Sequence, residues 1–230
     1  MQQDLATRYP LVLVPGMLGF VRMVLYPYWF GIVPALRKGG AQVFPVQVSP
    51  LHSSEVRGEQ LLAIIDDICQ RTGVDKVNLI GHSQGALSAR YAAAKRPGRV
   101  ASVTSVAGPN HGSELADHLE RTAPGHSPQG RVLKAVLHGF AVLLVWLETG
   151  WRRDPLPVDV HASHQSLTSA GVALFNQAYP QGLPDTWGGE GPAEVNGVRY
   201  YSWSGTLQPG LTDQGRNRFD GSNRFCRLFA

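Results

Sequence analysis

Two kinds of hydrophobic pattern alternate over residues 1–106. Short runs rich in β-branched residues predict strands at residues 9–14, 41–48, 77–81 and 100–106. Between them, apolar residues at three- and four-residue spacing predict amphipathic helices, whose buried stripes are Trp29, Ile32, Val33 and Leu36, and then Leu61, Ile64, Ile65 and Ile68. A run of small residues after Ser83 predicts a third helix, ending near Lys95. This alternation predicts an α/β fold with a mostly parallel sheet and helices on both faces.

The pattern changes over residues 113–180, where no segment alternates like a strand. This region contains Arg131 to Leu147, which is apolar almost all round and is interrupted by Lys134 and His138. We interpret the run as too short and too punctuated for a membrane span, so no transmembrane segment is expected. Two interpretations remain open, a buried helix and a lid over an apolar site.

Turn signals mark the start and end of several elements. Gly39 and Gly40 end the first helix, the second begins near Ser53 and ends at Gly73, and Val195-Asn196-Gly197-Val198 predicts a hairpin leading into a strand at 199–204. A chain of 230 residues with 43% hydrophobic content suits a single domain over residues 1–230.

Composition excludes some classes of function. The net charge is +4, only 17% of the residues are charged, and no helix is basic, so a nucleic-acid partner is not expected. Cys69 and Cys226 are too few for a metal site, and Cys69 falls on the apolar face of a helix, as a core thiol does. Residues 1–9 carry no apolar run, so no signal peptide is visible. The chain is therefore either retained in the cytoplasm or secreted with its signal removed.

A serine lies where the third strand meets the third helix, in Gly81-His82-Ser83-Gln84-Gly85. Two glycines at this spacing predict a nucleophile elbow, a sharp turn that lifts the Ser83 hydroxyl out of the sheet and that side chains at positions 81 and 85 would block. The backbone N–H of Gln84, at a helix N-terminus, would then face an oxyanion. The alternative is a serine in a tight connection without chemistry.

The first strand ends in Pro15-Gly16-Met17-Leu18-Gly19-Phe20, a loop with glycines. In a serine hydrolase of this architecture the loop after an early strand supplies the second oxyanion donor, and the N–H of Met17 is the candidate. The alternative is an ordinary loop between a strand and a helix.

The general base is harder to find. In this type of enzyme the nucleophile, the acid and the histidine follow one another along the chain, and none of the eight histidines comes after His164. An ordered triad would need one of His111, His118, His126, His138, His161 and His164, with an acid from Glu114, Asp117, Glu120, Glu148, Asp154 and Asp159. These acids lie in or beside the possible lid rather than at strand ends. Such a triad is not expected.

Several longer stretches share a resemblance to one family. They are residues 13–20, 28–32, 54–61 and 77–85, Phe175-Asn176, residues 179–182 and Val195-Asn196-Gly197. Together they resemble the bacterial triacylglycerol lipases of the Pseudomonas and Burkholderia type, with Pro15 where the family usually has a histidine. The resemblance implies an α/β-hydrolase fold, hydrolysis of acyl esters, Ser83 as the nucleophile, Met17 and Gln84 as the oxyanion pair, and a lid over about 113–180.

The resemblance also implies that family members continue beyond Ala230 and carry their catalytic acid and histidine there. It matches Asp220 to the first calcium-binding aspartate of these lipases, whose other ligands lie in the same missing part. A single carboxylate cannot hold calcium, which binds six or more oxygens, so calcium is expected only in a longer form. The alternative for Asp220 is a turn aspartate before a glycine.

The sequence therefore predicts a carboxylic ester hydrolase of the lipase type that forms an acyl-enzyme on Ser83 and needs no cofactor for its chemistry. Its expected partners are an acyl ester or lipid substrate and a lipid–water interface. Because the acid and base are missing, we expect a C-terminally truncated chain with weak activity or none. A polyester hydrolase would have the same chemistry. From another class, a non-catalytic fold would bind an acyl ligand or a partner through residues 131–147.

Overall fold

The computed structural model describes residues 4–23, 25–149, 155–184, 186 and 189–205. Its centre is a six-stranded sheet in the order β4-β1-β5-β6-β8-β7, whose strands are β1 (Leu11–Val14), β4 (Val43–Pro45), β5 (Val77–His82), β6 (Val100–Val106), β7 (Glu194–Val195) and β8 (Val198–Trp203). Neighbouring strands are parallel, except that β7 and β8 form an antiparallel hairpin. The expected mostly parallel sheet is confirmed.

Helices cover both faces of this sheet, and strand β1 shows why. Val12 and Val14 are buried in the core shared with α2 (Ser54–Thr72) and α3 (Gln84–Lys95). Leu11 and Leu13 point the other way, into a second core with Trp29 and Val33 beside α1 (Ile32–Lys38). Successive side chains of a strand alternate between faces, so an apolar residue at every position of β1 requires cover on both sides.

The residues expected to cap the second helix and to form the hairpin turn do so. Ser53 caps α2 by accepting a hydrogen bond from Val56 N (3.3 Å), and Gly73 ends the helix in the left-handed conformation (φ 70°). Asn196 and Gly197 have φ angles of 54° and 75°. This pair of positive φ angles suits the tight turn between β7 and β8, and the predicted hairpin is confirmed.

Two predicted elements are shorter than expected. Strand β4 covers only Val43–Pro45, and Val46 N still donates to Leu13 O (3.1 Å) just beyond its end. Helix α1 starts at Ile32, after Gly31 with φ 73°, so Trp29 packs from the preceding loop rather than from the helix. That loop follows a two-stranded hairpin, β2 (Arg22–Met23) and β3 (Tyr26–Pro27). A short 3₁₀ turn, Pro97–Arg99, links α3 to β6.

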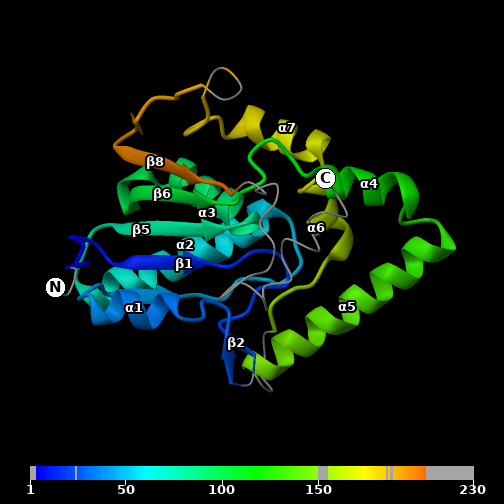
Figure 1. The fold of residues 1–230 in the computed structure, drawn as a ribbon, viewed down its shortest axis with the longest axis horizontal. Helices are drawn as coiled ribbons and strands as arrows, with labels where there is room; N and C mark the ends of the chain where they lie inside the picture. Colours follow the sequence, from blue (N-terminus) through cyan, green and yellow to red (C-terminus); the bar gives the residue numbers. More distant parts are fainter. Residues whose placement is uncertain (1–3, 24, 150–154, 185, 187–188, 206–230) are drawn as a thin grey trace, which may run out of the picture.

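Residues 113–149 and 155–178 contain four helices and no strand, as predicted. They are α4 (Glu114–Thr122), α5 (Pro128–Thr149), α6 (Val160–Gln165) and α7 (Ser169–Ala178). Ser113, Asp159 and Thr168 cap α4, α6 and α7 through their side chains. In Figure 1, α7 lies close to the sheet, whereas α5 forms a long arm on the opposite side from the N-terminus.

Helix α5 corrects the interpretation of the apolar run. The helix has 22 residues, more than the predicted span of 131–147, because Ser127 accepts hydrogen bonds at its start and the helix continues to Thr149. Its segment Pro128–Glu148 is long and apolar enough to cross a bilayer, so the judgement that the run is too short was wrong. Length and composition alone do not assign a membrane span, and only 22% of the apolar window is buried within the protein.

The single domain over residues 1–230 stays a prediction, because residues 206–230 lie outside the described part of the chain.

The close packing of α2 on α3 gives a first testable prediction. A Cβ on Gly58 would lie 2.3 Å from Cδ1 of Tyr91, whereas a Cβ on Gly139 in α5 would meet nothing within 4 Å. Gly58→Ala should therefore lower the free energy of unfolding by about 1–3 kcal/mol through overpacking. Gly139→Ala should raise it by about 0.5–1 kcal/mol, because alanine favours a helix interior. Urea denaturation measures both, and equal shifts would contradict the packing argument.

Candidate active site

Ser83 sits at a strained turn between β5 and α3. Its φ and ψ angles are 53° and −128°, a conformation that residues with a side chain rarely adopt. Ser83 N donates to Val106 O (3.0 Å), and Ser83 O accepts from Ala86 N (3.0 Å), so the adjacent strand and the first helical turn hold the strained residue in place. The half-buried serine stands at the carboxyl end of β5.

Both flanking glycines are required by close backbone contacts. A Cβ on Gly81 would lie 2.4 Å from Gly85 O, and a Cβ on Gly85 would lie 2.4 Å from Val14 O. Real side chains do not approach backbone atoms this closely, so the expected collision at both positions is confirmed. The turn geometry that the sequence predicted at residues 81–85 is therefore present.

The loop with Met17 runs directly past this serine. A Cβ on Gly16 would lie 2.9 Å from Ser83 Cβ. Gly16 O accepts hydrogen bonds from Arg57 Nη2 (3.0 Å) and Gly19 N (3.1 Å). The described chain has no cis peptide, so the N–H of Met17 points away from Gly16 O and hence away from the buried Arg57. Among the described contacts, the Met17 amide has no hydrogen-bond partner.

The side chain and the backbone N–H of Gln84 have different roles at this turn. The side chain is fully buried, with Oε1 accepting from Arg57 Nη1 (2.9 Å) and Nε2 donating to His52 O (2.8 Å) and Ser166 Oγ (3.0 Å). These bonds hold the side chain inside the protein. The backbone N–H is left at the first position of α3, where helix amides have no intrahelical partner.

Arg57 connects the turn at Gln84 to the loop that carries Met17. The side chain is completely buried and donates to Gln84 Oε1, to Pro15 O (2.5 Å) and to Gly16 O. Burial lowers the pKa of its guanidinium to about 10, because the charged form loses its hydration. The group stays protonated at neutral pH, and its charge is stabilised by three oxygens that would otherwise be poorly solvated.

Tyr28 fixes the other side of the Met17 loop. Its hydroxyl accepts from Gly16 N (3.1 Å) and lies 2.6 Å from His82 Nδ1. One proton is shared in this contact, and whether the hydroxyl or Nδ1 donates depends on the tautomer of His82. Burial lowers the pKa of His82 and raises that of Tyr28, which favours this neutral pair.

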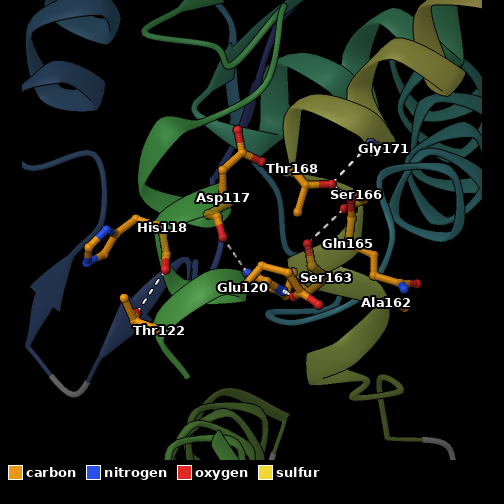
Figure 2. Close-up of polar contacts among 12 residues, drawn as sticks. Asp117, His118, Glu120, Thr122, Ala162, Ser163, Gln165, Ser166, Thr168 and Gly171 are labelled. Atoms are coloured by element: carbon orange, nitrogen blue, oxygen red, sulfur yellow. Dashed lines mark hydrogen bonds and ion pairs between the residues drawn. The ribbon is translucent and has the colours of Figure 1, made fainter. Parts of the chain in front are cut away.

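The candidate acids and bases serve other contacts. His164 Nδ1 lies 3.0 Å from Glu120 Oε2, and its Nε2 donates to Ala116 O (2.9 Å). Asp117 accepts from the backbone and hydroxyl of Ser169 (2.9 and 2.6 Å) at the start of α7. Figure 2 shows the neighbourhood of α4 and α6, in which the His118 ring points away from Ser163 and Gln165. No described hydrogen bond joins an imidazole nitrogen to Ser83 Oγ.

A cavity of about 450 Å³ lies between α4, α5 and α6. Leu119, Leu133, Leu137 and Val160 form its apolar part, and His126, His161 and His164 are among its polar residues. Ser83 is not among the described residues that line it, so the cavity is separate from the elbow.

Comparisons with known proteins decide the family. Residues 9–209 match the alpha/beta hydrolase fold family. A triacylglycerol lipase of Pseudomonas fragi is 46% identical over 230 residues, covering 100% of this chain and 77% of that protein. A triacylglycerol lipase of Vibrio cholerae is 47% identical over 199 residues, covering 86% of this chain and 63% of that protein. The chain belongs to the α/β-hydrolase triacylglycerol lipases.

Solved structures agree on the fold of this chain. The mature form of Bacillus licheniformis lipase BlEst2 aligns with a TM-score of 0.56 at 20% identity, covering 96% of this chain and 74% of that one. Staphylococcus hyicus lipase aligns with a TM-score of 0.53 at 19% identity, covering 78% and 66% of the two chains. The expected fold and the resemblance to bacterial lipases are confirmed.

Other expectations for this chain stay predictions. Asp220 lies outside the described residues, so a calcium site that includes it is untested. Within the described ranges, no group of three His, Cys, Asp or Glu side chains could hold a metal ion. The roles of Ser83, Met17 and Gln84 are consistent with the geometry above and need the experiments given below.

Sequence reasoning assigned no role to Arg57, although a signal was present. Arg57 falls four residues before Leu61, on the same stripe of α2 as Ile65 and Ile68, which are buried. A charged residue on the apolar face of an amphipathic helix indicates an internal hydrogen-bonding role. For Tyr28 and His82 no such signal exists, because their contact joins residues 54 positions apart.

The buried guanidinium gives a second prediction. In Arg57→Lys, one compact ammonium cannot reach Gln84 Oε1 and both loop carbonyls. We expect the free energy of unfolding to fall by about 1–3 kcal/mol, because buried acceptors lose their donors. Arg71→Lys is the matched control on the same helix, since Arg71 forms an exposed pair with Asp67, and it should change stability by less than about 0.5 kcal/mol. Equal losses in chemical denaturation would contradict the proposed role of Arg57.

The Tyr28–His82 pair gives a third prediction, on pH. Because burial lowers the pKa of His82 in the folded protein, the unfolded chain takes up this proton first, near its ordinary value of about 6.5. The stability contributed by neutral His82 is complete above that pH and is lost as the pH falls through the folded-state pKa. His82→Asn keeps an acceptor for Tyr28 but does not titrate.

Denaturation at about pH 7.5 and about pH 5 should therefore show a smaller loss of stability for His82→Asn than for the wild type. The same loss in both proteins would show that His82 does not contribute to acid sensitivity.

Proposed function

We propose that this lipase-family chain hydrolyses carboxylic esters of acylglycerol type through an acyl-enzyme on Ser83. The observation that carries the proposal is the strained Ser83 between two obligatory glycines, with the amides of Met17 and Gln84 free of described partners beside it. A strained residue held at such cost at the end of a parallel strand is typical of a reactive group. The curated relatives from Pseudomonas fragi and Vibrio cholerae are named triacylglycerol lipases.

The chemistry follows from these groups. Ser83 Oγ attacks the ester carbonyl carbon as a base removes its proton, and the carbonyl electrons move to oxygen. The N–H groups of Met17 and Gln84 donate to that oxyanion. Collapse of the tetrahedral intermediate expels the alcohol, which takes the proton, and water then releases the acid by the same steps in reverse. Each oxyanion donor is worth about 10²–10³ in kcat.

Among the residues that the structure describes, no general base is placed at Ser83. The described contacts place no imidazole on Ser83 Oγ, and His52, His82 and His164 have other hydrogen-bond partners. We therefore propose that this chain carries the nucleophile and the oxyanion donors, and that full turnover requires a base that these contacts do not supply. Loss of one triad member costs on the order of 10⁴–10⁶ in turnover.

Helix α5 supports the proposal of a lid that works at a lipid–water interface. Val132 and Val136 are 66% and 63% exposed, and Phe140, Leu143 and Trp146 are also exposed. A contiguous apolar surface of this kind on one helix is typical of contact with lipid or with an apolar substrate. The lid and the interface remain proposals.

A non-catalytic function is the second candidate. The lack of a described base at Ser83, together with the exposed apolar face of α5, favours a fold that binds an acyl ligand without cleaving it. The two candidates differ in whether Ser83 reacts.

A fluorophosphonate probe and a short-chain nitrophenyl ester test the proposed function, which is the fourth prediction. The probe should label Ser83 alone, slowly in the absence of a base and faster with added imidazole, as located by mass spectrometry, and Ser83→Ala should abolish labelling. Ester turnover should be slow, on the order of 10⁴-fold or more below that of a complete triad, and added imidazole should raise it in the wild type beyond the background of Ser83→Ala.

The outcomes separate the candidates. Labelling at another residue would remove Ser83 from the mechanism. Turnover within about a hundredfold of an ordinary esterase would show that a base is present after all. No labelling, combined with saturable binding of a fatty acid to the wild type and to Ser83→Ala, would favour the non-catalytic function.

A further inference from the structure

A carboxylate at the end of α5 binds the backbone of strand β2. Glu148 Oε1 accepts hydrogen bonds from Val21 N and from Arg22 N, the latter at 2.6 Å. The two segments are 127 residues apart in the sequence, and Figure 1 shows that the end of α5 lies beside β2. One carboxylate oxygen therefore satisfies two neighbouring amides of the hairpin.

Strand β2 is the direct continuation of the loop that carries Met17. Val21 O accepts from Tyr28 N (3.2 Å), and the Tyr28 hydroxyl accepts from Gly16 N (3.1 Å). Glu148 is therefore connected to the Gly16–Met17 peptide by two routes, one along the backbone and one across the hairpin. The second route also reaches His82, the neighbour of Ser83.

The position of Glu148 violates two local preferences. It lies in the last turn of a helix, where the helix dipole disfavours a negative charge. It is also half-buried, its Oε2 is buried without a described partner, and burial raises the pKa of the carboxyl. A residue that is unfavourable for its own helix is expected to serve a contact elsewhere. For Glu148, that contact is the pair of hydrogen bonds with the amides of Val21 and Arg22.

The same end of α5 is its anchored end. Ala141, Leu144 and Val145 are buried, whereas Val132 and Val136 in the first half are exposed. A movement of α5 would therefore be largest at its N-terminal half. The link through Glu148 would transmit such a movement to β2 and to the loop.

We propose that Glu148 is a positioning residue of the esterase site, which holds β2 and the Met17 loop in place and couples that loop to the position of α5. The proposal depends on the proposed function only for the role of Met17 as an oxyanion donor. The contact itself exists whether or not the chain is an efficient enzyme, so one test can be made without catalysis.

The fifth prediction uses Glu148→Ala and Glu148→Gln, with Glu190→Gln as the matched control on an exposed residue. In Glu148→Ala, amide hydrogen exchange over residues 15–28 should become about tenfold faster, because the Val21 and Arg22 amides lose their acceptor. Glu148→Gln keeps a carbonyl acceptor and should stay within about threefold of the wild type. Glu190→Gln should not change the exchange.

Kinetics give the second readout. In Glu148→Ala, kcat for the nitrophenyl ester should fall by about 10–100-fold with KM nearly unchanged, because a displaced donor stabilises the transition state less. Glu148→Gln should restore most of the rate. In Glu148→Ala combined with Tyr28→Phe, the loss should be smaller than the product of the single losses, because both act on the Gly16–Met17 peptide.

The results separate this proposal from the proposed function. Unchanged exchange over residues 15–28 in Glu148→Ala would overturn it, and so would a loss confined to KM. If wild-type Ser83 neither reacts with the probe nor turns over ester, the proposed function fails, and exchange alone decides the coupling. If Glu148→Ala does not fold, the near-isosteric Glu148→Gln and the shorter Glu148→Asp decide it, since only the former can span the distance to both amides.

Discussion

The buried guanidinium of Arg57 is the contact on which the arrangement around Ser83 depends. It donates to the carbonyl oxygens of two successive peptides, Pro15–Gly16 and Gly16–Met17, and to the side chain of Gln84. The charge orients both peptides. Because Gly16 O points toward the guanidinium and the peptide is trans, the Met17 N–H points the opposite way. A polar group from α2 thereby sets the direction of a backbone donor on a different segment. Without it, the loop after β1 would keep only hydrogen bonds that its own amides donate, from Gly16 N to the Tyr28 hydroxyl (3.1 Å), from Leu18 N to Pro50 O (2.7 Å) and from Gly19 N to Gly16 O (3.1 Å).

The elbow was predictable because its causes are local. Gly81 and Gly85 are excluded from carrying side chains by backbone atoms of the same turn and of the adjacent strand, so their spacing around Ser83 is itself the signal. The hairpin at Asn196-Gly197 was predictable for the same reason, since positive φ angles restrict the residues that fit. The alternation of strands and helices predicted the parallel sheet and the helices that pack on both of its faces.

Contacts between distant segments were not predictable. Nothing in the sequence around Glu148 indicates a partner at Val21, and nothing at Tyr28 indicates His82. The extent of α5 was also missed, because Lys134 and His138 interrupt the apolar run without ending the helix: both have helix-compatible side chains that reach solvent from its surface. Among the candidate triad acids, Asp117 and Glu120 contact neighbouring helices and Asp159 caps α6, so these three carboxylates serve structural contacts, while the expectation that no ordered triad forms stays a prediction.

Strand β4 has a consequence for how molecules of this chain meet one another. It forms one border of the six-stranded sheet, and it is three residues long with a proline at its end. An outer strand with so few free amides is a poor template for a strand from another molecule. The parallel sheet that carries the serine is thus protected on that side against intermolecular strand addition, which favours a chain that stays dispersed even though α5 presents apolar side chains elsewhere.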